Sequence, residues 1–258
     1  MKYPIVDTHA HLCHPAFDED LAEVLEKAQK TGICAILLVG ETLADAAKNL
    51  DLARQYPILK PAAGLYPEFL DDKAADDIIA FIRRHHRQLA AIGEVGLDHW
   101  IVKTDSGKAL QQTLFKRFID LAAELDLPLN VHSRSAGKKA IELLLQCGAA
   151  RVQMHAFDGK ASSAMPAVEA GYFFSIPPSV IRSRQKQKLV KRLPLSSLLL
   201  ETDSPVLGPV ANQRNRPDNI TVAIDAMAEI KGVRKEAVIE ATAVNTQVLY
   251  GDSMFTSA

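Results

Sequence analysis

Residues 5–40 begin with IVDTHAHL (5–12), continue through EDLAEVLEKAQK (19–30) and end with ICAILLVG (33–40). The first and last of these segments are short and apolar, which is typical of buried strands. The middle segment has apolar residues at three- and four-residue spacing, as on one face of a helix. A strand, a helix and a second strand in this order indicate a parallel strand pair joined by a helical crossover.

The same alternation continues to the end of the chain. The centres of the predicted strands are about 27 residues apart, close to the repeat of a (β/α)8 barrel. An open doubly wound sheet is the structural alternative, but the G-x-G-x-x-G and G-x-x-x-x-G-K-[ST] nucleotide motifs are missing. We therefore expect an α/β fold, a (β/α)8 TIM barrel, formed as a single domain by residues 1–258. Further strands are predicted at 59–66, 90–98, 127–133, 151–157, 171–176 and 197–203, and further helices at 43–55, 75–87, 108–125 and 138–146.

Composition and charge exclude several classes of protein. The chain has 30 Lys and Arg against 31 Asp and Glu, and 48% of its residues are hydrophobic. This composition fits a folded domain with a large core, and the net charge of −1 argues against extended binding to nucleic acid through bulk charge. The three cysteines are far apart in the sequence, and neither a signal peptide nor a run of 18 apolar residues is recognisable. We expect a cytoplasmic protein with no membrane segment and no obligate protein partner.

Residues that bind metals recur where the predicted strands end. His9 and His11 end the first strand and are two residues apart, so both imidazoles point to the same side. The carboxyl ends of all strands in a barrel meet at one face, which brings distant residues together. Six such side chains are too many for one tetrahedral ion with an open position and suit two divalent ions bridged by a carboxylate and a water. They are His9, His11, Glu94, His132, His155 and Asp203.

Seven motifs resemble, in order and spacing, those of the TatD-related metal-dependent DNases, a family of the amidohydrolase-like TIM-barrel superfamily. The resemblance spans essentially the whole chain. It implies a first metal site formed by His9, His11, Glu94 and Asp203. It implies a second site formed by Glu94, His132 and His155, so that Glu94 bridges the two ions. The motifs are DTHAHL (7–12), GEVGLD (93–98), HSR (132–134), HAFDG (155–159), LLLETDSPVL (198–207), RNRPDNI (214–220) and NTQVLY (245–250).

Two positions depart from the family pattern. The family commonly has G-x-H-P after the third strand, whereas this chain reads GLYP at 64–67, so that Tyr66 replaces a histidine that often faces the substrate. Asp158 adds a carboxylate near the expected mouth of the barrel, where the family usually has a small residue. Both changes bear on the substrate, and neither removes an expected metal ligand.

The resemblance implies hydrolysis of phosphodiester bonds in DNA, at single strands or strand ends and with 3′–5′ exonuclease polarity, by water that two metal ions activate. Asp203 is the expected general base, because it is a ligand within reach of that water. Glu94 is the second expected catalytic carboxylate. Sites of mixed imidazole and carboxylate ligands accept Mg²⁺, Mn²⁺ or Zn²⁺ according to availability, so the sequence leaves the metal open.

Four residues are candidates for contact with the substrate. Arg134, Arg214 and Arg216 are expected to bind phosphate oxygens, because planar guanidinium groups match phosphate geometry and loops at this end of a barrel often hold phosphate. Tyr66 is the fourth candidate, since it takes the place of the family histidine.

A basic run and two aromatic residues each allow two interpretations. RSRQKQKLVKR (182–192) contains six basic residues and no acid, which fits either a contact with nucleic acid or a solvated helix face. Trp100 and Phe157 are candidates either for stacking on bases or for packing against loops.

Two other functions fit parts of the sequence. An amidohydrolase or phosphoesterase acting on a small molecule would share the barrel and the H-x-H pair, but many dinuclear members of that class bridge their metals with a modified lysine on the fourth strand. No lysine occurs between Gly93 and Asp98. A non-catalytic metal-binding protein would tolerate the loss of ligands, whereas all six are present. The sequence therefore favours a nuclease.

Overall fold

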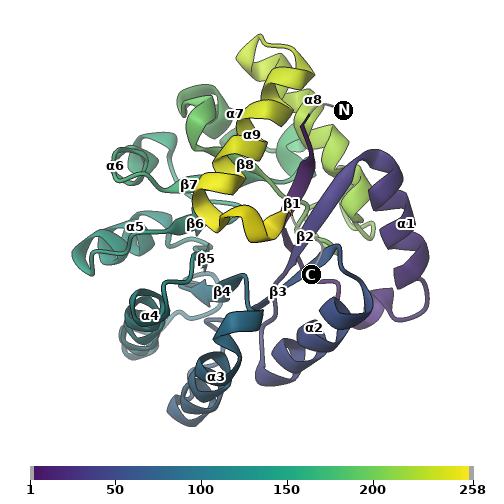
Figure 1. The fold of residues 1–258 in the computed structure, drawn as a ribbon. Coiled ribbons are helices and arrows are strands. Elements are labelled where there is room, and N and C mark those ends of the chain that lie inside the picture. The colour runs from purple at the N-terminus through teal and green to yellow at the C-terminus, as the bar shows by residue number, and fades with distance from the viewer. Residues whose placement is uncertain (1–2, 256–258) are drawn as a thin grey trace.

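A computed structural model describes residues 3–255 and contains eight strands, all paired in parallel and arranged in the order β1 to β8 (Figure 1). Helices surround the strands, and none within the described residues is long and apolar enough to cross a membrane. The strands are β1 Ile5–Ala10, β2 Ile33–Leu38, β3 Leu59–Ala63, β4 Ala91–Gly96, β5 Leu129–His132, β6 Val152–Met154, β7 Phe173–Ile176 and β8 Leu198–Leu200. The helices are α1 Leu21–Thr31, α2 Leu43–Gln55, α3 Asp72–His85, α4 Asp105–Leu125, α5 Gly137–Gln146, α6 Met165–Glu169, α7 Arg184–Arg192, α8 Ile220–Lys231 and α9 Lys235–Tyr250.

Hydrogen bonds between the first strand and the segment after the last one nearly close the barrel. The Asp203 amide donates to the His9 carbonyl oxygen and the His11 amide donates to the Ser204 carbonyl oxygen, both at 2.8 Å. The buried Asp7 carboxylate accepts a further hydrogen bond from the Thr202 amide at 2.9 Å. The predicted (β/α)8 TIM barrel is thereby confirmed, although residues 1, 2 and 256–258 of the predicted domain lie outside the described part of the chain.

The predicted and observed elements agree in type, and several of them differ in length. The helix predicted at 43–55 has the observed bounds of α2. The strand predicted at 197–203 is observed only as Leu198–Leu200, because the chain turns soon after it and Asp203 takes a positive φ of 56°. The strand predicted at 151–157 likewise ends at Met154. In both places the residues predicted to continue the strand, HAF at 155–157 and ETD at 201–203, lie outside the sheet.

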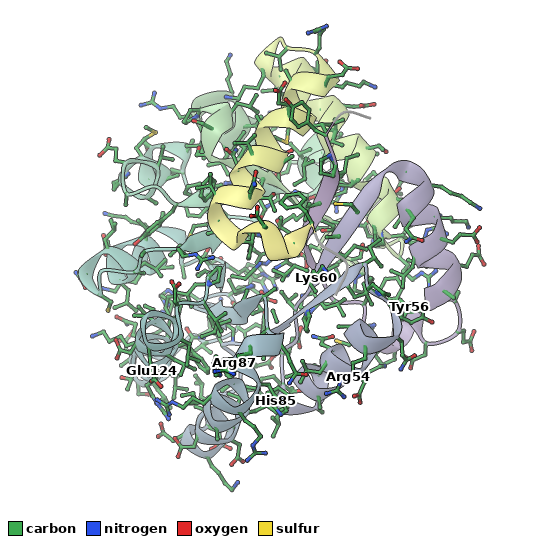
Figure 2. All side chains as sticks on the ribbon, viewed as in Figure 1. Arg54, Tyr56, Lys60, His85, Arg87 and Glu124 are labelled. Carbon is green, nitrogen blue, oxygen red and sulfur yellow. The ribbon has the colours of Figure 1, made fainter. Side chains whose placement is uncertain are left out.

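Helix α9 covers the N-terminal end of the barrel. Asn245 donates from Nδ2 to the carbonyl oxygens of Leu195 and Leu198, at 2.9 and 2.8 Å. Tyr250 donates its hydroxyl proton to Gln153 Oε1 in the barrel interior at 2.6 Å. In Figure 1 this yellow helix crosses in front of the strands, and the labelled Arg54, Lys60 and Arg87 of Figure 2 lie at the same end. The carboxyl ends of the strands are therefore the end left open for a site.

Candidate metal centre

The six predicted metal ligands come together at the carboxyl ends of the strands. Three of them lie within strands and three follow a strand closely in the sequence. The side chain of His11 is 12% exposed, and the others are more deeply buried. His9 lies in β1, Glu94 in β4 and His132 in β5, while His11, His155 and Asp203 follow β1, β6 and β8.

Glu94 lies at the centre of this group, and its two oxygens face different histidines. Oε2 lies 3.2 Å from His11 Nε2 and 3.7 Å from His9 Nε2. Oε1 lies 2.6 Å from His132 Nδ1 and 3.3 Å from His155 Nε2. A carboxylate placed in this way can bridge two cations.

Asp203 completes the side of the group formed by β1. Its Oδ1 lies 3.4 Å from His9 Nε2 and 3.6 Å from His11 Nε2. The donor atoms of His9, His11 and Asp203 all lie within 4.8 Å of one another, and so do those of His9, Glu94 and His155. Both sets have the spacing that a metal ion requires.

A close approach of two strands sets the position of Glu94 relative to His132. Gly96 ends β4 with a φ of 146°, which side chains rarely adopt, and a β-carbon there would lie 2.1 Å from the His132 carbonyl oxygen. Only glycine therefore lets β4 and β5 lie this close where both carry site residues.

Polar neighbours fix the orientation of three of the histidine rings. Asn130 donates to the Thr8 carbonyl oxygen, which leaves its Oδ1 as the acceptor for His9 Nδ1 at 2.8 Å. His132 Nε2 lies 3.0 Å from Asp98 Oδ2, and His155 Nδ1 lies 3.3 Å from Glu201 Oε2. Since these oxygens only accept, each outer nitrogen is the donor, and the inner nitrogen carries the lone pair when the ring is neutral. Such outer partners are typical of metal-binding histidines.

The donor set fits divalent metal ions. Imidazole nitrogens and carboxylate oxygens are ligands for zinc, manganese and related ions. The inner nitrogens of His9, His132 and His155 lie 3.4, 2.6 and 3.3 Å from carboxylate oxygens of Asp203 or Glu94. No lysine or arginine of residues 3–255 forms an ion pair with Glu94 or Asp203. The cluster therefore has the donor set of a site for divalent cations.

The charges of the cluster shift the pKa values of its own side chains. Burial raises the pKa of Glu94, but the nearby His155 and His132 outweigh burial and hold it well below its usual range. Burial lowers the pKa of His155, but Glu201 and Glu94 outweigh it and raise that pKa well above the usual range. These shifts favour the ionised carboxylate of Glu94 and the doubly protonated imidazolium of His155. A metal ion that binds His155 must displace one of its two ring protons.

A cavity of about 460 Å³ opens from this cluster to the surface, and two of the four predicted substrate contacts line it. Tyr66 donates its hydroxyl proton to Asp98 Oδ2 at 3.0 Å. Burial, with Glu94 and Asp98 adding to it, raises the pKa of Tyr66 far above its usual range, so the phenol stays neutral. The guanidinium of Arg134 lies over the Trp100 ring, with Cζ 5.0 Å from the ring centroid.

The other two predicted substrate contacts, Arg214 and Arg216, do not line this cavity. Arg214 forms a two-pronged ion pair with Asp20, with Nη1 2.9 Å from Oδ1. Arg216 pairs in the same way with Asp218, at 3.1 and 3.0 Å. Both guanidinium groups already have a carboxylate partner, and a role in substrate binding stays a prediction for them.

The structure adds residues to the site that the sequence analysis did not single out. Asp98 holds the ring of His132 and is the last residue of the motif GEVGLD (93–98). Glu201 holds the ring of His155 and lies in the motif LLLETDSPVL (198–207). Asn130 lies two residues before His132 on β5, so it could have been found from strand periodicity. Glu41 and Lys186 line the cavity without such a signal.

The two aromatic candidates differ in exposure. Phe157 is fully buried and packs edge-to-face on Phe174, with the ring centroids 5.3 Å apart, so it is a core residue and not a surface for bases. Trp100 is 57% exposed, next to Arg134 at the cavity. Asp158 lines the cavity as expected and accepts a hydrogen bond from the Ser135 amide at 2.8 Å.

Comparison with known proteins identifies the family. Residues 6–251 match the model of the family described as TatD related DNase. The chain belongs to this family. Among TatD-family relatives, it is 47% identical to deoxyribonuclease TATDN3 of Homo sapiens, over 95% of this chain and 94% of the human protein. It is 31% identical to an uncharacterized metal-dependent hydrolase of Bacillus subtilis, over 95% of this chain and 98% of that protein.

Solved structures of TatD proteins agree with this assignment. The chain superposes on the TatD homologue YJJV of Escherichia coli with a TM-score of 0.88 and 28% identity, covering 97% of this chain and 99% of the other. A lactonase resembling phosphotriesterases from Deinococcus radiodurans shares the fold alone, with a TM-score of 0.64 and 17% identity. The expectation of a metal-dependent hydrolase of the TatD family is confirmed.

Proposed function

We propose that this chain is a deoxyribonuclease that hydrolyses phosphodiester bonds at a centre of two divalent ions. His9, His11, Glu94 and Asp203 would hold one ion, and Glu94, His132 and His155 the other. The observation that carries this proposal is the placement of Glu94, whose Oε2 faces the β1 histidines while Oε1 faces His132 and His155. A single carboxylate between two sets of imidazoles is the arrangement that a bridged pair of ions needs.

The residues at the mouth suit a phosphodiester substrate. Bound divalent ions would polarise the phosphoryl group, neutralise its oxygens and acidify the attacking water. Asp203 is in the cavity lining and 5% exposed, so its carboxylate can accept the proton of that water. Tyr66 donates its single proton to Asp98, so its hydroxyl oxygen is the atom that can accept a hydrogen bond from the substrate in place of the family histidine.

DNA is the proposed substrate because the human relative is named a deoxyribonuclease and shares 47% of its residues with this chain over nearly its whole length. The near-neutral net charge favours a short contact with a strand end over a long binding footprint. We therefore extend the proposal to exonuclease cleavage of single strands or strand ends with 3′–5′ polarity.

A labelled-oligonucleotide assay tests this proposal. The protein is loaded separately with Mg²⁺, Mn²⁺ or Zn²⁺ and incubated with single-stranded DNA that carries a 5′ label. We expect a ladder of fragments shortened from the 3′ end, no cleavage in the presence of chelator, and a loss of more than 100-fold in Glu94→Gln, since that change weakens both ion sites. Glu124→Gln is the matched control, because Glu124 is exposed and paired with Arg83 far from the site.

Intact DNA with all three metals would contradict the proposal. If the same preparations hydrolysed amides, esters or small phosphoesters, the site would belong to an amidohydrolase or phosphoesterase acting on small molecules. Release of mononucleotides from the 5′ end would overturn the polarity alone.

A further inference from the structure

Lys186 extends from the outer helix layer to the candidate metal centre. It lies in the first turn of α7 and is 9% exposed, unlike its neighbour Lys188, which is exposed. Its side chain lines the same cavity as Glu94, His155 and Asp203. One residue of the basic run 182–192 is therefore a site residue rather than part of a solvated face.

Among residues 3–255, the ammonium group of Lys186 has one hydrogen-bond partner. Nζ donates to the Ala156 carbonyl oxygen at 2.8 Å. Within residues 3–255 it forms no ion pair with a carboxylate. An ammonium group has three protons to donate, so two of them are left for a group in the cavity.

Burial without a close counter-ion is unfavourable for a cation. Desolvation lowers the pKa of Lys186, and the more distant Glu201, Asp203 and Asp158 offset this only in part. A buried charge is normally retained where a partner compensates for its loss of water. An anion bound in the cavity would supply that partner.

The other cations near the mouth differ from Lys186. Arg214 and Arg216 are each held by a carboxylate, Asp20 and Asp218. Arg134 has no ion pair in the described part of the chain but lies over Trp100 at the rim. Lys186 is the buried cation among those that line the cavity, which suits a contact close to the reacting group.

We propose that Lys186 Nζ binds a non-bridging oxygen of the substrate phosphate, on the β6–β7 side of the cavity, and so selects phosphate esters over neutral substrates. The proposal rests on the proposed function, since it assigns a residue to substrate binding at the same site. An ammonium group serves here as a point charge that hydrogen-bonds to phosphate.

A second role for Lys186 has to be separated from this one. Its bond to Ala156 also holds the backbone next to His155, and Ala156 has a positive φ of 37°. The adjacent Gln185 holds the same loop through the Gly159 carbonyl oxygen at 2.7 Å. Lys186→Gln retains an uncharged donor for Ala156, whereas Lys186→Arg retains the charge, so the two variants distinguish anchoring from phosphate binding.

Kinetics and phosphate binding test the proposal together. The substrates are bis(p-nitrophenyl) phosphate and a single-stranded oligonucleotide, and inorganic phosphate is used both as an inhibitor and as the ligand in calorimetry. In Lys186→Gln we expect kcat/KM to fall about 10- to 100-fold and phosphate to bind correspondingly more weakly, as for the loss of a hydrogen bond to a charged group. Lys186→Arg should keep most of the wild-type kcat/KM and phosphate affinity. Lys188→Gln, on the same helix, should have a kcat/KM and a phosphate affinity within about twofold of wild type.

Three results would bear on the proposal separately from the proposed function. Unchanged phosphate binding and kcat/KM in Lys186→Gln would overturn it while leaving the nuclease intact. If kcat/KM fell equally in Lys186→Gln and Lys186→Arg, with reduced metal content and unchanged phosphate affinity, the proposal would be overturned. Lys186 would then act by holding the backbone next to His155. If wild type cleaved no phosphodiester but bound phosphate in a Lys186-dependent way, the proposed function would fail and the phosphate contact would stand.

Discussion

The side-chain amide of Asn130 orients the ring of His9. Asn130 accepts from His9 Nδ1 at 2.8 Å, and its Nδ2 lies 3.3 Å from the Tyr250 hydroxyl, which in turn donates to Gln153. A line of hydrogen bonds thus runs from the covered end of the barrel to the metal centre. Because outer partners of this kind fix both ring direction and tautomer, they contribute to metal affinity without touching the metal.

Replacing Asn130 by Ala should therefore weaken metal binding. We expect a loss of about 10- to 100-fold in affinity, since His9 loses the acceptor that keeps Nε2 free for the metal. Titration of the chelator-treated protein with Zn²⁺ or Mn²⁺ against a competing indicator measures it. Asn245→Ala is the control, because Asn245 is an equally buried asparagine whose partners are backbone carbonyls of the β8 segment. Equal metal affinity in Asn130→Ala and wild type would refute the role.

The role of a single residue could be predicted where the nearby sequence indicates it. The grouping of the six candidate ligands could be predicted because each lies near the carboxyl end of a strand or just after it, and strand order alone brings these ends together. The partner of Arg214 could not, since Asp20 lies 194 residues away and nothing near either residue marks the pair. The depth of Lys186 was hidden for a different reason. A basic run looks alike whether one of its members points inward or all of them face water.

At the scale of secondary structure, helix α9 is fixed to the barrel by a few side chains. Asn245 donates two hydrogen bonds to carbonyl oxygens on either side of the start of β8. Leu249 accepts from Arg151, with Nη2 2.7 Å from its carbonyl oxygen. Together with apolar packing of Leu249 and Tyr250 on the interior of the barrel, these bonds hold the helix across the N-terminal end.

Asn245→Ala should destabilise the fold and leave the metal centre in place. The change removes the hydrogen bonds to the buried Leu198 and the partly buried Leu195 carbonyl oxygens, which costs about 2–3 kcal/mol in the free energy of unfolding. Urea denaturation followed by circular dichroism measures this cost, and Gln247→Ala, on the same helix and exposed, should change stability by less than about 0.5 kcal/mol. A midpoint for Asn245→Ala equal to that of wild type would show that the packing of α9 does not depend on these bonds.

Element types were more predictable than element ends. The period of apolar residues distinguishes strands from helices, and α2 was predicted with its observed bounds. The ends of β6 and β8 were not, because no glycine or proline marks the point where HAF follows Met154 or ETD follows Leu200. Where the backbone leaves the sheet is decided by contacts with other strands, such as the bonds of Thr202 and Asp203 to β1.

Across the whole molecule, the candidate metal centre joins five strands of the barrel or the segments that follow them, namely β1, β4, β5, β6 and β8. Ions that bind the folded chain and not the unfolded chain stabilise it by mass action, by about 2.7 kcal/mol at 100 times Kd. For a chain of this size that corresponds to a rise of about 5–10 °C in Tm.

Removing the metal should reverse this rise. We expect chelator to lower the Tm of the metal-loaded protein by about 5–10 °C and added metal to restore it. Differential scanning calorimetry gives the shift, and it should largely vanish in Glu94→Gln, which removes the shared carboxylate. A Tm that chelator leaves unchanged in the loaded wild-type protein would argue against a metal bound through all of these strands.

The near-closure of the barrel between His9 and Asp203 has a consequence for synthesis of the protein. Residues of the centre come from the first strand and from the segment after the last, so a chain emerging from the ribosome holds His9 and His11 long before Asp203 exists. The complete centre can assemble only after about four-fifths of the chain has been made. Loading with metal is therefore a late event, and a truncated product lacking the last strand would retain the histidine pair and lack the site.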